Sequence, residues 1–342
     1  MTLTDLKTKI KSSDIAGAYI FCGEEDYLKK HYLGEFANIC CPDEAFATFN
    51  HAVFNGDDVD IADISEAIKA PPFLGELKLI EWRYPDLEHM REGEKSAIEE
   101  LCAMLPDYPY ATFVILTDAE GFIPGTVKKP SKLSARLGKC FNIVIFDKCN
   151  DAQLAGWIKR HFEADGVAIE PTAPAALIFR SGHSMEVLNN EILKLTAYAK
   201  ANGLTAIGKK EIDLVASPTL ECDAFALSTA ITDKDRDGAF RAIADMKGRR
   251  MEPGAVLAMM AKSFGELSTV SALLDEGMNA KDIEELLRWN PYKIKFSVNS
   301  AKKWGTTKLA DATSRLRKLD GDSKSGGPSG FKIIELFICE FI

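Results

Sequence analysis

The sequence lacks long apolar runs. Its apolar segments are short, as in "FVIL" at 113–116, and none approaches the ~20 apolar residues that a membrane-spanning helix needs. The first residues, "MTLTDLKTKIKSSD", contain no apolar stretch like that of a secretory signal. We therefore expect no membrane span, no secretory signal and a cytoplasmic protein.

Cysteine and histidine are present, but not in the spacing that binds a metal. The eight cysteines include no CxxC pair, and the five histidines do not cluster. There is no HExxH motif and no zinc-ligand spacing, so we expect neither a metal site nor a cofactor. Without a secretory signal, the cysteines are expected to be reduced thiols, most of them in the core.

Positive charge is in the minority, with 42 Lys and Arg against 51 Asp and Glu. The formal net charge of −9 argues against a simple nucleic-acid binder. The charge is unevenly distributed, because residues 218–342 hold 19 Lys and Arg against 18 Asp and Glu, whereas the rest of the chain has a net charge of −10. The acidity is therefore a property of the N-terminal part.

The length of 342 residues and the hydrophobic content of 46% indicate a globular chain of two or three domains. Residues 1–147 alternate strand and helix signals, which predicts a parallel sheet covered on both faces. The expected strands are Ala18–Cys22, Phe46–Phe54, Lys78–Arg83, Ala111–Thr117 and Asn142–Phe146, and the expected helices between them are Asp26–Ile39, Ile61–Ala70 and Glu94–Met104.

From residue 151 on, helix signals replace strand signals. Asp151 and Ser184 are the expected N-caps of two helices in a compact helical domain near 148–217. Residues 218–342 predict a helical bundle, since no heptad repeat is sustained. Its expected helices are Asp223–Thr232, Asp235–Lys247, Pro253–Glu276, Ala280–Leu287, Pro291–Gly305, Lys308–Lys318 and Phe331–Ile342.

The stretch "AYIFCGEEDYLKKHYL", residues 18–33, has the order strand, glycine turn, helix that nucleotide-binding loops share. Such a loop needs several glycines, a lysine, and a Ser/Thr hydroxyl for Mg²⁺. Gly23 is the only glycine here, and no Lys-Ser/Thr pair follows it. Glu24, Glu25 and Asp26 stand where phosphate would lie, and like charges about 4 Å apart repel by roughly 4 kcal/mol at an effective dielectric of about 20. The stretch therefore predicts an ordinary strand-to-helix corner.

A working ATPase also needs acidic residues at the end of a second strand to position the metal. The candidate strand, "LKLIEWRYPD", offers only Glu81. We interpret this glutamate as an exposed strand end.

The segment "AIKAPPFLGELKLIEW", residues 67–82, places two bulky apolar residues outside any periodic pattern. Pro71 and Pro72 must end the preceding helix, and Phe73 and Leu74 follow on that rigid corner. From the residues alone, burial beneath the sheet is the favoured interpretation. The alternative is a hydrophobic plug for a pocket on a partner.

A basic segment lies in the C-terminal part, where nine Lys and Arg but only one acid, Asp311, occur between Arg288 and Lys318. Four of these bases are candidate contacts to DNA or within a collar of packed helical domains: Lys293, Lys295, Lys302 and Lys303. The segment is interleaved with Trp289, Tyr292, Phe296 and Trp304. Basic stretches with aromatics can follow a nucleic-acid backbone, and the alternative is a solvated helix face with core aromatics.

Four motifs in order resemble one family, the delta subunit of the bacterial DNA polymerase III clamp loader. "YIFCGEEDYLKKHYL" is similar to its N-terminal strand–helix signature, "APPFLGELKLI" to its proline–aromatic segment, and "EVLNNEILKLTAYA" to its middle-domain helix. "LRKLDGDSKSG" resembles its Leu-x-x-x-Asp-x-x-x-Lys-Ser-Gly pattern. That pattern is matched at Leu316, Asp320, Lys324, Ser325 and Gly326.

The resemblance implies a multidomain α/β plus all-α protein. It implies a RecA-like parallel-sheet AAA+ domain with a degenerate P-loop at 1–147, a small helical lid domain at 148–217, and a C-terminal helical collar domain for oligomerisation at 218–342. These are the three segments that the helix and strand signals delimit.

The resemblance also implies a function. Delta binds the beta sliding clamp and opens its ring for loading onto primed DNA, together with gamma/tau and delta-prime subunits in a hetero-pentamer. It is a subunit of a DNA-directed DNA polymerase, a nucleotidyltransferase complex, but is expected to have no catalytic activity and no nucleotide site of its own. The family's clamp-binding pair falls on Phe73 and Leu74, which favours the plug over burial, although Leu77 stands where arginine is common.

Two further positions concern the ability to sense or hydrolyse ATP. In the ATPase relatives an arginine of the lid senses the γ-phosphate, and "GHSMEVL" places Met185 there. Where some relatives carry an arginine finger, "GKC" at 138–140 has Lys139. Two rival functions remain at this point: an AAA+ ATPase with an atypical nucleotide loop, and a stand-alone DNA-binding protein.

Overall fold

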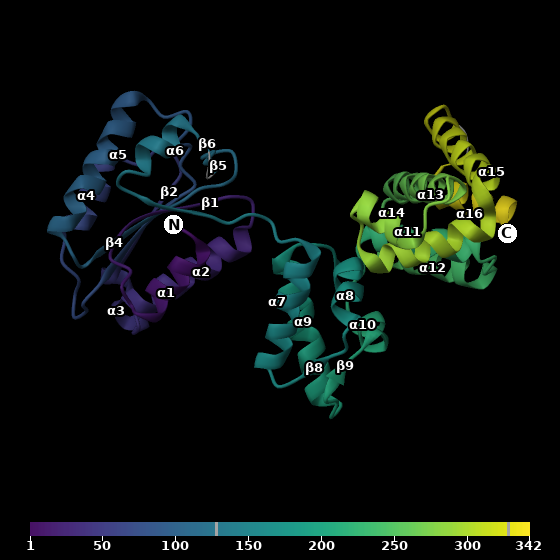
Figure 1. Cartoon of the computed structure of the whole chain (residues 1–342), viewed down its shortest axis with the longest axis horizontal. Helices are drawn as coiled ribbons and strands as arrows, with labels where there is room; N and C mark the ends of the chain where they lie inside the picture. The colour runs from purple at the N-terminus through teal and green to yellow at the C-terminus, as the bar shows by residue number, and fades with distance from the viewer. Residues whose placement is uncertain (127–128, 327–328) are drawn as a thin grey trace. The chain divides into compact units, whose positions relative to one another are not determined.

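The computed structural model describes residues 1–126, 129–326 and 329–342, with the side chains in these ranges except those of residues 44–46. The chain forms two compact units, Met1–Cys149 (unit 1) and Asn150–Ile342 (unit 2) (Figure 1). In the described part of the chain, no helix combines the length and the apolarity that crossing a membrane requires.

Unit 1 is built on a parallel sheet with the strand order β2-β3-β4-β1-β7. Because β1 pairs in parallel with both β4 and β7, the carboxyl ends of these three strands lie at one edge of the sheet, where open α/β sheets usually bind ligands. The strands are β1 (Gly17–Cys22), β2 (His51–Asn55), β3 (Lys78–Arg83), β4 (Ala111–Leu116) and β7 (Asn142–Ile145), and a separate small pair consists of β5 (Gly125–Thr126) and β6 (Lys129–Pro130).

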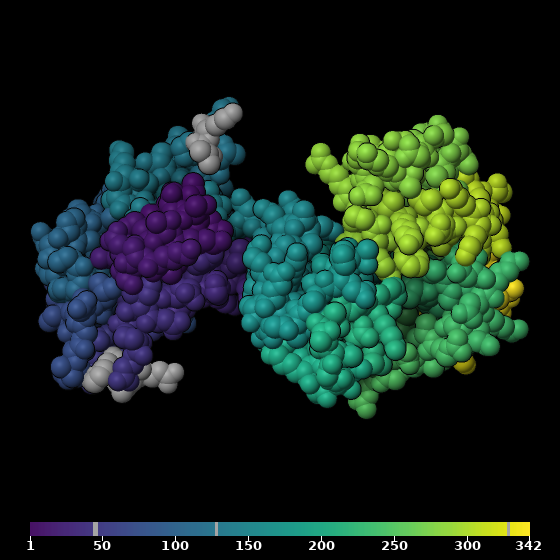
Figure 2. All heavy atoms as spheres, turned by 60° about the horizontal axis from the view of Figure 1, so that its bottom comes forward, coloured from purple at the N-terminus to yellow at the C-terminus, as the bar shows by residue number. Residues whose placement is uncertain are grey.

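Helices cover both faces of this sheet (Figure 1). Alternate residues of a strand point to opposite faces: Tyr19 and Phe21 pack in the core beneath α1 and α2, whereas Ile20 and Cys22 pack in the core beneath α4, α5 and α6. In the space-filling view α1 lies on the outside of unit 1 (Figure 2). The helices are α1 (Leu3–Lys11), α2 (Asp26–Cys40), α3 (Glu44–Asn50), α4 (Ile61–Lys69), α5 (Glu92–Met104), the short 3₁₀ turn Leu105–Asp107, and α6 (Lys132–Leu137).

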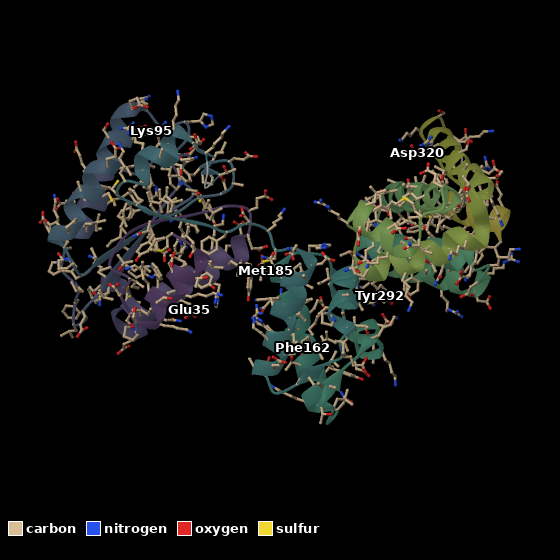
Figure 3. All side chains as sticks on the ribbon, in the orientation of Figure 1. Glu35, Lys95, Phe162, Met185, Tyr292 and Asp320 are labelled. Carbon is tan, nitrogen blue, oxygen red and sulfur yellow. The ribbon has the colours of Figure 1, made fainter. Side chains whose placement is uncertain are left out.

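In its described residues, 150–326 and 329–342, unit 2 is helical apart from one two-residue strand pair. Phe162, labelled in Figure 3, is fully buried among the first of its helices. The elements are α7 (Asp151–Ala164), β8 (Ala168–Ile169), α8 (Ala173–Ser181), α9 (Met185–Ala201), β9 (Ala206–Ile207), α10 (Lys209–Val215), α11 (Leu220–Thr232), α12 (Arg236–Gly248), α13 (Pro253–Asp275), α14 (Ala280–Leu287), α15 (Pro291–Lys324) and α16 (Phe331–Phe341).

The helices from α11 to α16 share one hydrophobic core. Phe264 of α13 lies near its centre, with its ring centroid 5.8 Å from that of Trp304 and 5.3 Å from that of Phe337. Helix α15 is interrupted at Gly305, whose φ of 73° and ψ of 166° are not helical. The predicted break between two helices at this glycine is therefore confirmed, whereas the second helix runs on to Lys324, beyond the predicted end.

Most predicted elements are confirmed, and the errors have physical causes. The predicted strand Phe46–Phe54 is wrong in its first half, because residues 44–50 form α3 and only His51–Asn55 is a strand. Phe46 and Phe49 are three residues apart, a spacing that fits a helix face, and short apolar runs do not distinguish the two structures. The N-cap of α7 is Asn150 rather than Asp151, since the Asn150 side chain accepts the Gln153 N–H.

Candidate functional site

The corner between β1 and α2 is closed by the protein's own backbone. A Cβ atom on Gly23 would lie 2.5 Å from the carbonyl oxygen of Phe146, at the end of β7. The same oxygen accepts a hydrogen bond from the Glu25 N–H at 2.9 Å. Gly23 has a φ of 104°, which only glycine adopts readily. The glycine therefore lets β7 approach the turn and leaves little room beside it.

Lys29 fills the inner side of this corner. Its side chain is 1% exposed, and Nζ donates hydrogen bonds of 2.7 Å to the carbonyl oxygens of Gly23 and Thr117. Nζ also lies 2.8 Å from a carboxylate oxygen of Asp26. Phosphate loops direct backbone N–H groups at their ligand, but here two carbonyl oxygens point inward. Apart from its i,i+3 spacing from Asp26, nothing in the sequence pattern indicates this role for Lys29.

The carboxylates of the corner differ in their surroundings. Glu25 is buried at 8% exposure, and burial raises the pKa of its carboxyl group. Glu24 is exposed and lies 3.3 Å from the ammonium of Lys148. A second anion such as a phosphate would meet these acidic groups together with the inward carbonyl oxygens, so the corner is electrostatically unsuited to it.

Glu81 is not an exposed strand end, and that interpretation is wrong. It lies inside β3 and is 1% exposed. One carboxylate oxygen is 2.6 Å from Nε2 of His51 on the neighbouring β2, and the other is 2.5 Å from the guanidinium of Arg83. A carboxylate held between two basic groups satisfies the requirement that buried charges be paired.

Phe73 and Leu74 are exposed, so the burial that the residues alone favoured is wrong. Helix α4 ends at Lys69, and Ala70 takes the extended conformation (ψ 119°) expected before a proline. On the loop that follows, Phe73 is 49% exposed and Leu74 is 76% exposed. Leu74 has a φ of 51°, a left-handed conformation that costs a residue with a Cβ about 1–2 kcal/mol.

The loop that carries this pair is held at several points. The buried Asn50 side chain accepts the Phe73 N–H at 2.6 Å and donates to the Phe73 carbonyl at 2.9 Å. The Lys78 ammonium donates to the Ala70 carbonyl at 3.3 Å, and burial lowers the pKa of that ammonium. The Tyr110 hydroxyl donates to the Lys69 carbonyl at 2.7 Å. Sequence reasoning missed Asn50, which lies more than twenty residues before the loop.

The four basic candidates of α15 lie in different surroundings. Lys293 is buried, and its ammonium is 2.9 Å from Glu221 and 2.8 Å from Glu266. Lys303 pairs with Asp233 at 2.7 Å. The remaining two are exposed and stand seven residues apart on the helix, which places them on one face: Lys295 and Lys302.

The aromatic residues of this basic segment pack against other groups of unit 2. The rings of Tyr292 and Phe296 are 4.8 Å apart, and Tyr292 is also 5.3 Å from Phe179. Tyr292 is labelled near the start of α15 in Figure 3. The indole N–H of Trp304 donates to the Thr232 carbonyl at 2.9 Å. Trp304 therefore fits the predicted alternative of core packing, whereas Tyr292 and Phe296 are partly buried and line a pocket beside Phe179. The charge at Lys295 and Lys302 faces solvent.

Neither of the two positions at which the ATPase relatives carry arginine holds an arginine here. Met185, labelled in Figure 3, begins α9 and is 1% exposed, so it is part of the hydrophobic core. Lys139 is exposed after α6 in unit 1. Among the described residues no group of three or more His, Cys, Asp or Glu is arranged to hold a metal ion.

The fold defines the class of protein: a multidomain chain with a RecA-like parallel α/β sheet of the AAA+ type and a helical C-terminal region. Two family models then match the chain, "DNA polymerase III, delta subunit" over residues 19–122 and "DNA polymerase III delta subunit, C-terminal domain" over residues 221–341. Together they span about two thirds of the sequence. The chain belongs to the DNA polymerase III delta subunit family.

A relative known by its sequence and a solved structure, both from Bacillus subtilis, match nearly the whole chain. The DNA polymerase III subunit delta of Bacillus subtilis (strain 168) is 20% identical over 345 residues, covering 99% of this chain and 96% of that protein. The solved structure of the Bacillus subtilis DNA clamp loader delta protein has a TM-score of 0.60 and 19% identity, and covers 99% of this chain and 98% of that one. The predicted fold class and family are confirmed, and the chain is a clamp-loader subunit of DNA polymerase III that takes part in DNA replication.

Proposed function

We propose that the chain binds the beta sliding clamp through Phe73 and Leu74 and holds one interface of the ring open. The observation that carries this proposal is the exposure of two adjacent large apolar side chains, 49% and 76%, on a loop that hydrogen bonds hold in place. A held loop presents its side chains without the entropy cost of ordering them on binding. The clamp pocket receives the pair, and unit 1 acts as a wedge beside the ring interface.

In the proposed mechanism the chain acts by binding alone, and it makes or breaks no covalent bond. Residues 1–147 form the clamp-binding domain, 148–217 the lid and 218–342 the collar, through which the chain joins gamma/tau and delta-prime subunits. The neighbouring ATPases control access to the clamp, and the pentamer places the opened ring on primed DNA in the cytoplasm. The direct test is calorimetric titration of the chain with the sliding clamp of its own organism. We expect a saturable complex, and its absence would refute the proposal.

We expect no measurable binding of Mg-ATP by the isolated chain. The inward carbonyls of Gly23 and Thr117 and the Lys29 ammonium occupy the corner that a triphosphate would need. Titration with a fluorescent ATP analogue and excess Mg²⁺ checks this, with a functional ATPase subunit as positive control. Tight binding would favour the rival function, an AAA+ ATPase with an atypical loop.

We further propose that Lys295, Lys302 and Lys303 face the DNA chamber or a neighbouring collar, whereas Lys293 serves an internal ion pair. Burial alone would raise the pKa of Glu221, but the ammonium groups of Lys293 and Lys262 outweigh it and hold that pKa below its usual value. This pairing ties α15 to α11 and leaves Lys293 unsuited to a phosphate contact.

The proposed DNA contact predicts a measurable change in the salt dependence of DNA affinity. Removing one lysine–phosphate contact changes the slope of log affinity against log salt by about 0.9, so Lys295→Glu/Lys302→Glu should reduce the slope of the assembled loader by up to about 2. The control Lys281→Glu/Lys332→Glu alters the same charge on exposed lysines of α14 and α16. Equal slopes for both pairs would assign the face to the collar or to solvent. A salt-dependent gel shift by the isolated chain would instead favour a stand-alone DNA-binding protein.

A further inference from the structure

A third large apolar side chain lies against the proposed clamp-binding pair. Phe49, near the end of α3, is 59% exposed, and its ring centroid is 5.1 Å from that of Phe73 with the planes tilted by 45°. In the described part of unit 1, the most exposed large apolar side chains are Leu74, Phe49, Ile123 and Phe73. Three of these four thus gather at one place, although about twenty residues separate α3 from the loop.

The residue after Phe49 fixes the loop from beneath. Asn50 is 2% exposed, and its amide spans the Phe73 peptide groups, accepting from N–H and donating to C=O. Both of its hydrogen-bonding ends are thus matched to backbone groups, which only a primary amide can do with one donor end and one acceptor end. The two bonds hold the residue immediately before Leu74, which takes a left-handed conformation (φ 51°).

We propose that the end of α3 is the second half of the clamp-binding element, with Phe49 a third apolar contact and Asn50 the positioning residue for Phe73 and Leu74. The proposal rests on the proposed function, because it assigns the same partner to a surface continuous with the pair. An apolar surface of three neighbouring side chains, two of them aromatic, suits the hydrophobic centre of a protein interface better than two side chains alone. The partner is the sliding clamp, at the rim of the pocket that receives Leu74.

Phe49 is tested by calorimetric titration of full-length variants with the clamp of the same organism. We expect Phe49→Ala to weaken binding about tenfold, since a ring that is 59% exposed in the free chain has only that part of its transfer energy to gain on binding. Ile123→Ala, which removes another exposed side chain of unit 1 (55% exposed), should leave affinity unchanged.

The outcomes separate this inference from the proposed function. If Phe49→Ala binds like wild type while Phe73→Ala/Leu74→Ala does not bind, the inference is overturned and the proposed function stands. If both variants bind like wild type, the proposed function fails and this inference with it. If Phe49→Ala binds the clamp like wild type but no longer assembles with the other loader subunits, the surface contacts those subunits and the inference is overturned.

Asn50 is tested by a double-mutant cycle with Phe73. Asn50→Asp keeps the shape and the acceptor but turns a second oxygen toward the Phe73 carbonyl, and should weaken clamp binding about tenfold. If Asn50 acts through the pair, the same change should have a smaller effect in a Phe73→Ala background, because only its action on Leu74 remains. A purely structural role would give equal effects in both backgrounds and would overturn the assignment.

A second variant covers the case in which Asn50→Asp does not fold. A Cβ on Gly75 would lie 3.0 Å from Nδ2 of Asn50, so Gly75→Ala presses on the same contact from the loop side and leaves Asn50 intact. We expect a smaller loss of affinity, about threefold, with an unchanged melting temperature. Wild-type affinity in this variant and in a folded Asn50→Asp variant would contradict the positioning role.

Discussion

Phe73→Ala/Leu74→Ala is expected to weaken binding to the sliding clamp by roughly two to four decades in Kd. Full burial of a large apolar side chain contributes about 1.5–3 kcal/mol, and each 1.4 kcal/mol is about tenfold in affinity. The estimate is an upper one, because Phe73 is already half covered in the free chain. Calorimetry or surface plasmon resonance with the clamp of the same organism measures the loss.

The fold should survive this double substitution, because both side chains project from the surface and contribute little to the core. A matched control is Ile123→Ala/Leu193→Ala, which removes side chains that are 55% and 56% exposed at other places on the two units. The control should bind the clamp like wild type. Equal affinity of the double variant and this control would remove Phe73 and Leu74 from the interface and refute the assignment.

The sheet and most helices were predictable from the sequence, because their apolar residues recur over segments long enough to distinguish the helical period from that of a strand. Strand Lys78–Arg83 and helix Ala280–Leu287 have the predicted bounds, and Gly305 marks the predicted break in the last long helix. The short helix α3 was missed, since its apolar residues fit either period. Burial of Glu81 was missed because its partner His51 lies on another strand, and strand pairing is not visible in local sequence.

The candidate site was predictable only in part, because contacts between distant segments are again not visible in local sequence. The prolines locate the loop, and the family resemblance singles out Phe73 and Leu74, but the residues alone favoured burial of the pair. The loop that presents them is bonded to Asn50, at the end of a helix elsewhere in the chain. A contact between segments twenty or more residues apart leaves no periodic signal, and the same holds for the bond between Lys29 and Thr117.

Lys29→Ala is expected to destabilise unit 1 by about 2–4 kcal/mol. The substitution removes the donor for two carbonyl oxygens, one of them in a fully buried residue, Thr117. Leaving a buried acceptor without a partner costs about 1–3 kcal/mol, and truncating the side chain leaves a cavity. Urea unfolding followed by hydrogen exchange of β1 and β4 reports on unit 1 alone, which matters because the two units need not unfold together.

Two variants separate the causes of that loss. Lys30→Ala changes the exposed neighbour of Lys29 and should alter stability by no more than about 0.5 kcal/mol. Lys29→Met keeps most of the volume and removes the donors, so it isolates the cost of the unpaired carbonyls. If Lys29→Ala were as stable as Lys30→Ala, water would be able to reach Gly23 and Thr117, and the corner would be more open than its contacts indicate.

Lys29→Ala also tests whether the corner is a nucleotide site that the Lys29 side chain merely blocks, or a corner that no longer has the groups to bind a nucleotide. If Lys29 alone excluded ATP, Lys29→Ala would gain Mg-ATP binding as its stability fell. We expect no gain, because Glu24 and Asp26 remain beside the turn and the Phe146 carbonyl still occupies the space next to Gly23. The lysine of a phosphate loop binds its ligand, whereas Lys29 binds the backbone of its own sheet. Replacing Lys29 should therefore lower the free energy of unfolding and leave the affinity for nucleotide unchanged.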